Sequence, residues 1–189
     1  MPWLVIITAY SLGAIPTAYI AGHLMGKDIR QLGDQNVGAA NAYRELGHKI
    51  GLAVFFIDAG KGVLAVLIAH AADLSQVGVF FTGMVAVLGH EWSVFIGFKG
   101  GKGVSTTIGI LLVLNTVPIL ILAGPTVLTL YLVKNLTPAM CVLFMALPLV
   151  SWWAGVSGAL ISYGIALPGL VGITDLVKNR QLAHRARHA

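Results

Sequence analysis

Residues 89–107 read GHEWSVFIGFKGGKGVSTT and interrupt a chain that is apolar for tens of residues on either side. Because glycine has no Cβ, its backbone N–H groups can converge on one point, and a concave run of amides binds anions. The lysines of the stretch add positive charge, and a helix expected from about Ser105 would direct its positive N-terminal end at the same ligand. The stretch therefore predicts a phosphate-binding loop, with an ordinary charged loop between two membrane helices as the alternative. It is not a Walker A loop, since Lys102 is followed by Gly103 and position 96 is Ile.

The composition indicates a membrane protein. Of the 189 residues, 57% are hydrophobic and only 10% are charged, whereas soluble domains carry about 25% charged residues. The length predicts a single domain over residues 1–189. The apolar stretch that begins at residue 3 has no basic segment before it and is too long for a cleaved signal peptide, so we expect a first membrane helix there. The single cysteine, Cys141, lies in an apolar run, which favours a buried thiol.

The hydropathy pattern predicts an all-α integral membrane protein with seven transmembrane helices, since about 20 apolar residues cross a bilayer. The expected spans cover residues 3–25, 50–71, 77–98, 104–114, 119–133, 139–154 and 156–173.

The basic residues predict the orientation of these spans. Only Lys61 lies inside a span, and seven crossings place the other eleven on the side of the C-terminal tail. Positively charged loops stay in the cytoplasm. We therefore expect the N-terminus outside, the C-terminus in the cytoplasm, and an active site on the cytoplasmic side of a multi-pass cell (inner) membrane protein. The eleven are Lys27, Arg30, Arg44, Lys49, Lys99, Lys102, Lys134, Lys178, Arg180, Arg185 and Arg187.

A second polar loop, GDQNVGAANAYRELG at residues 33–47, is expected on the same side as the glycine-lysine loop. Arg44 carries a planar guanidinium suited to phosphate, and the amides of Asn36 and Asn41 can both donate and accept hydrogen bonds. The alternative is a solvated interfacial loop. Since the two loops share a face, we expect them to enclose one polyanion.

Three further side chains have open roles. Asp58 and Lys61 are three residues apart and share a helical face, which favours an ion pair that holds helices in register over a functional site. His90, next to the glycine-lysine loop, is either a catalytic base or substrate ligand, or a plain hydrogen-bonding residue.

The motifs at residues 33–47, DAGKG at 58–62, GH at 89–90 and FKGGKGVST at 98–106 resemble those of the bacterial acyl-phosphate:glycerol-3-phosphate acyltransferase family. The resemblance covers roughly residues 1–110. It implies a seven-span enzyme that moves an acyl group from acyl phosphate to glycerol 3-phosphate, producing lysophosphatidic acid and phosphate. It also implies that Asn36, Arg44 and Lys102 hold the phosphorylated substrates, and that the donor's own phosphate takes the hydroxyl proton.

The chain departs from the family pattern at several positions. Asp34-Gln35-Asn36 stands where the family usually has Ser-Gly-Asn, and Ala40 stands where it has Thr. Only Thr137 remains of a hydroxyl pair, and Leu176 replaces a histidine three residues before Asn179. The carboxylate of Asp34 would repel a bound phosphate unless a cation such as Arg44 neutralises it.

The predicted function is therefore acyl transfer between these two substrates in phospholipid biosynthesis. The alternatives are a transporter or channel for an organic phosphate, or an acyltransferase with a different acceptor. The expected partners are the two substrates and membrane lipid, without nucleic acid; no cofactor and no metal is expected. The predicted catalytic residues are Asn36, His90 and Lys102, and the predicted binding residues are Asp34, Gly38, Asn41, Arg44, Lys99, Gly100, Gly101, Gly103, Thr106 and Asn179.

Overall fold

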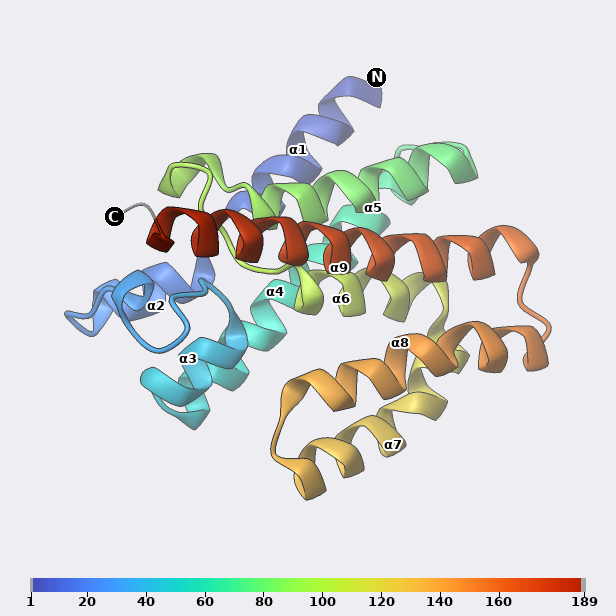
Figure 1. Cartoon of the computed structure of the whole chain (residues 1–189). Coiled ribbons are helices and arrows are strands. Elements are labelled where there is room, and N and C mark those ends of the chain that lie inside the picture. Colours follow the sequence, from blue (N-terminus) through green and yellow to red (C-terminus); the bar gives the residue numbers. More distant parts are fainter. Residues whose placement is uncertain (1, 188–189) are drawn as a thin grey trace.

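A computed structural model describes residues 2–187, with side chains as far as Val177. Every regular element in this part of the chain is helical (Figure 1). In chain order the elements are α1 Pro2–Ala14, α2 Thr17–Leu24, η1 Ile29–Gln31, α3 Ala39–Glu45, α4 His48–Ala71, α5 Gln76–Glu91, η2 Val94–Ile96, α6 Val104–Leu114, α7 Thr116–Val133, α8 Leu136–Trp153 and α9 Gly158–Arg187.

Small residues allow the central helices to approach closely. A Cβ added to Gly13 of α1 would lie 2.0 Å from the carbonyl oxygen of Ala86 in α5. A Cβ added to Gly109 of α6 would lie 1.9 Å from the carbonyl oxygen of Ala59 in α4. Helices in membranes associate through such small-residue contacts, because lipid provides little hydrophobic driving force between them. Helices α7 and α8 form a hairpin that extends away from this centre (Figure 1).

The first expected span is broken at Ile15-Pro16 into α1 and α2. Proline has no N–H to continue the helix, and the polar groups at the break have partners inside the protein. Lys61 donates to the carbonyl oxygen of Ile15, at the negative end of α1, and Thr17 donates to Asp58 at 2.7 Å. The predicted Asp58–Lys61 pair is present, with Nζ 2.6 Å from Oδ1 and both side chains buried.

The described part of the chain has six helical segments that are long and apolar enough to cross a membrane, instead of seven. They are Pro2–Leu24, His48–Ala71, Gln76–Ile96, Thr116–Val133, Leu136–Trp153 and Gly158–Val177. The expected fourth span is α6, whose 11 residues extend only about 16 Å against a hydrocarbon core of about 30 Å. It is short because it begins only after the glycines of the loop and ends at Asn115, which also precedes α7.

Three other expectations differ in detail from the structure. The third expected span does not continue as one helix to residue 98, because α5 ends at Glu91 and the chain then follows the short helix η2. The last span, Gly158–Val177, ends close to the expected residue 173, but its helix α9 continues beyond the span through the basic tail. Cys141 is exposed on α8 instead of buried, since it lies on the face that α8 turns away from its helix neighbours.

Candidate active site

The two polar loops meet at the end of α5. A Cβ added to Gly101 would lie 2.3 Å from Nε2 of His90 and 2.7 Å from the carbonyl oxygen of Val37. Gly101 is buried between a side chain of α5 and the backbone of the first loop. The structure therefore brings together the loops at residues 33–38 and 97–103, which the sequence placed only on the same face.

The glycines of the second loop cap α5. The amides of Gly100 and Gly101 donate to the carbonyl oxygens of Glu91 and His90, each at 3.1 Å, and so satisfy two of the carbonyls left over at the end of a helix. A Cβ on Gly100 would lie 2.0 Å from the His90 oxygen, and Gly103 has a φ of +79°. The expectation that a run of glycine amides converges on the anion therefore needs correction, because these two amides already have acceptors.

The N-terminal turn of α6 is a further candidate for holding an anion. Its helix begins at Val104, directly after Gly103, and the first N–H groups of a helix have no acceptor within it. The positive end of the helix dipole favours negative charge at this position. The hydroxyl of Thr106 in this turn is buried and has no hydrogen-bond partner among the described residues.

Lys102 forms an ion pair that the sequence did not predict. Its Nζ lies 3.1 Å from Oδ1 and 3.3 Å from Oδ2 of Asp175 in α9. The adjacent Thr174 donates its hydroxyl to Oε1 of Glu91 at 2.7 Å, in a buried contact. One signal was available in the sequence, since Asp175 is the only acidic residue after Glu91.

The first loop is held by Asn41, which is fully buried. Its amide nitrogen contacts the carbonyl oxygens of Ile29, Leu32 and Asn36 at 3.4, 2.9 and 3.1 Å, and its oxygen accepts from the amide of Asp34. These contacts use the hydrogen-bonding capacity of the amide. The structure therefore gives Asn41 a loop-holding position, while the neighbouring Asn36 is half-buried beside Gly38.

Arg44 and Asp34 form a second ion pair in this loop, with Nη2 2.6 Å from Oδ2 and both side chains about half exposed. The cation considered for neutralising Asp34 is thus in contact with it. At the entrance to the loop, the guanidinium of Arg30 lowers the pKa of the Asp28 carboxyl from 3.8 to about 2.

His90 connects the loops to the buried ion pair. Its Nδ1 lies 3.9 Å from Oδ1 of Asp58, and its Nε2 faces Gly101. The imidazole therefore lies between the break in the first span and the glycine-lysine loop. Lys99 is exposed, and the side chain of Asn179 lies outside the described residues.

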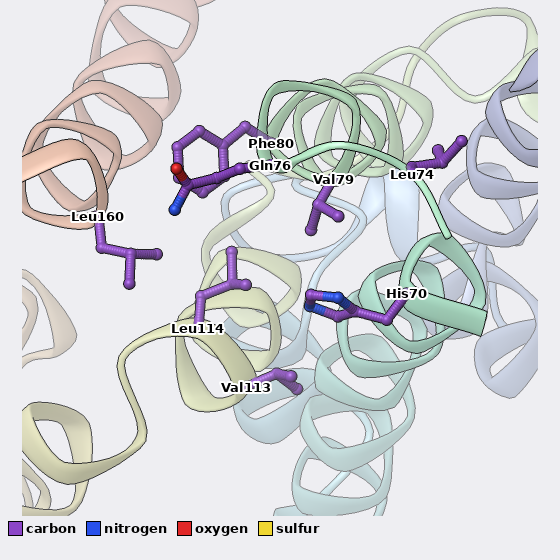
Figure 2. A pocket seen from close by; sticks show the side chains of 8 residues that line it. All are labelled: His70, Leu74, Gln76, Val79, Phe80, Val113, Leu114 and Leu160. Carbon is purple, nitrogen blue, oxygen red and sulfur yellow. The ribbon is translucent and has the colours of Figure 1, made fainter. Parts of the chain in front are cut away.

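A separate cavity of about 360 Å³ lies at the other end of α4 (Figure 2). His70, twelve residues beyond Asp58 and so about 18 Å further along the helix, borders it. Figure 2 shows mostly apolar side chains around it. Neither of the two cation-bearing loops contributes to its lining. Its lining residues are His70, Leu74, Gln76, Val79, Phe80, Val113, Leu114 and Leu160.

Fold and site together define an all-helical integral membrane protein with two cation-bearing loops beside a buried histidine. The model of the family described as glycerol-3-phosphate acyltransferase matches residues 3–187. The chain therefore belongs to the glycerol-3-phosphate acyltransferase family and is a membrane enzyme of the PlsY type. This membership overturns the alternative of a transporter or channel.

Individual relatives agree with the family match. The chain is 45% identical over 182 residues to glycerol-3-phosphate acyltransferase 4 of Dehalococcoides mccartyi, covering 96% of this chain and 98% of that protein. It is 36% identical to the enzyme of Geotalea daltonii, over 96% and 92% of the two chains. The glycerol 3-phosphate and lysophosphatidic acid forms of PlsY (YgiH), an integral membrane glycerol 3-phosphate acyltransferase, superpose with TM-scores of 0.84 and 0.82. Both are 32% identical, over 97% of this chain and 93% of theirs.

Proposed function

We propose that this enzyme transfers an acyl group from acyl phosphate to glycerol 3-phosphate and releases lysophosphatidic acid and inorganic phosphate. The observation that carries the proposal is the meeting of the two polar loops at Gly101, beside His90. Each loop contributes a cation that solvent reaches, Arg44 or Lys102, and the second loop adds the exposed Lys99. A reaction between two phosphorylated molecules requires two such positions close together.

The chemistry needs positioning more than a protein nucleophile. Acyl phosphate is a mixed anhydride and is already activated. The acceptor hydroxyl oxygen forms a bond to the acyl carbonyl carbon, the bond from that carbon to the phosphate oxygen breaks, and the departing phosphate takes the proton. Holding the hydroxyl in line with the carbonyl provides much of the rate enhancement, and charged donors stabilise the oxyanion and the leaving phosphate.

The residues divide these tasks by their places in the site. Lys102 and the N-terminal turn of α6 hold one phosphate, and Arg44 with Asn36 holds the other. His90 lies between the loops, where its imidazole can donate a hydrogen bond to the reacting groups. The buried Asn41 shapes the first loop through its backbone contacts.

We further propose that the chain crosses the membrane seven times, with α6 as the short crossing and the site on the cytoplasmic side. Helix α6 begins beside Glu91, at the site end of α5, and its last residues lie by Gln76 at the other end of α5 (Figure 2). If α6 did not cross, six of the loop cations would lie on one side and five on the other. With α6 crossing, all eleven lie on the cytoplasmic side, as the positive-inside rule favours.

The test is direct. Detergent-solubilised protein should release phosphate when acyl phosphate and glycerol 3-phosphate are both present, and mass spectrometry should detect lysophosphatidic acid. Other polyol phosphates should be assayed in parallel, because Asp34 stands where the family usually has Ser, whose hydroxyl can donate a hydrogen bond. Activity with another acceptor but not with glycerol 3-phosphate would keep the reaction class and change the substrate. No release with any acceptor would refute the proposal.

A further inference from the structure

Two of the cations in the site are held by carboxylates, whereas Lys99 is exposed. Lys102 is paired with Asp175, and Arg44 is paired with Asp34. Without substrate, the charges of these two cations are therefore already balanced by the carboxylates beside them. A phosphate monoester carries about −1.5 to −2 charges near pH 7. When it binds, it must compete with these carboxylates for the same cations.

We propose that Asp175 is a specificity-determining residue that occupies the phosphate position at Lys102 and must leave it when a phosphorylated substrate binds. This inference rests on the function proposed above. Both carboxylate oxygens of Asp175 lie close to the ammonium, at 3.1 and 3.3 Å. Two oxygens of a phosphate group would make the same kind of charge-assisted contact.

The pair is accessible to an incoming anion. The side chains of Lys102 and Asp175 are 41% and 29% exposed, so a solute can approach the ammonium without unfolding any element. By contrast, the buried Lys61 pairs with Asp58 at 5% and 1% exposure. The buried pair therefore holds helices together, whereas the partly exposed Lys102–Asp175 pair can exchange its partner.

The neighbouring residue allows this exchange without movement of α9. Thr174 is anchored to Glu91 through a buried hydrogen bond of 2.7 Å, so the backbone at this point of α9 stays docked on α5. Asp175 then needs only to rotate its side chain away from Lys102. The carboxylate sets the affinity for phosphate because its interaction with Lys102 is lost each time a phosphate binds.

The decisive variant is Asp175→Asn, which keeps the shape of the side chain and removes its charge. The variant should bind inorganic phosphate about two- to fivefold more tightly than wild type, the range expected when one exposed ion pair is removed. Binding is measured as phosphate-dependent thermal stabilisation of the purified protein. The KM for the substrate whose phosphate Lys102 holds should fall by a similar factor, with a smaller change in kcat.

Two controls complete the experiment. Asp175→Glu keeps the charge and should bind phosphate as wild type does. Asp73→Asn removes the same charge from the loop between α4 and α5, at the other end of these helices, and should also leave phosphate binding unchanged. Unchanged or weaker phosphate binding by Asp175→Asn would overturn the inference. The binding measurement is independent of turnover, so wild type that binds phosphate without transferring an acyl group would refute the proposed function alone.

Discussion

Replacing Lys102 with alanine should separate an effect on catalysis from an effect on folding. The Lys102–Asp175 pair is only partly buried, and ion pairs that solvent reaches contribute only about 0–1 kcal/mol to stability. A hydrogen bond from a charged donor to phosphate contributes about 1.5–3 kcal/mol. Lys102→Ala should therefore lower kcat/KM by about ten- to over a hundredfold, while the protein remains folded and inserted in the membrane.

The assay follows phosphate release from acyl phosphate in the presence of glycerol 3-phosphate, with thermal unfolding measured on the same preparation. Lys49→Ala, in the exposed first turn of α4, is the matched control and should keep normal kinetics. The double variant Lys102→Ala/Asp175→Asn should recover part of the loss, because it removes the carboxylate that Lys102→Ala leaves without its cation. Wild-type turnover in Lys102→Ala would refute the assignment of this lysine to phosphate.

Three further predictions concern the acceptor, the topology and the buried ion pair. Asp34→Ser should release Arg44 and lower the KM for glycerol 3-phosphate without changing that for acyl phosphate; an effect on the donor alone would move Asp34 to the other half of the site. A reactive tag after residue 189 should be labelled from the cytoplasm and one before residue 2 from outside, whereas labelling of both from one side contradicts seven crossings. Asp58→Leu should destabilise the protein by about 3–5 kcal/mol, because it leaves a buried cation without its partner. The double variant Asp58→Leu/Lys61→Met should have an unfolding free energy closer to that of wild type in the same detergent. A double variant as unstable as Asp58→Leu would contradict the explanation by an unpaired buried cation.

The structure changes how one glycine substitution is interpreted. Gly101→Ala is expected to cost activity, as the sequence already predicts from the approach of the backbone to a phosphate. Its added methyl would also collide with His90 and Val37. Loss of activity in this variant therefore reports on the packing of the two loops as well as on the anion, which is why Lys102 provides the cleaner test.

Local features of the sequence were sufficient to predict most of the helices, the buried ion pair and the family of this protein. Long apolar stretches predict helices that need no partner to identify them, because the bilayer requires about 20 apolar residues for a span. The spacing of Asp58 and Lys61 places them on one helical face whatever the surrounding fold, and the pair is present. The motifs of the two polar loops were specific enough to indicate the family that the comparisons establish.

Tertiary structure decided the contacts between distant segments. The amides of Gly100 and Gly101 are used by the end of α5, and a local pattern of glycines does not distinguish amides that cap a helix from amides that face a ligand. Asp175 reaches Lys102 across 73 residues of sequence, and the packing of α9 against α5, α6 and α8 brings it there. The length of α6 could not be predicted either. An apolar pattern indicates that a segment prefers lipid or protein to water, but it does not indicate where a loop and a neighbouring helix end the segment.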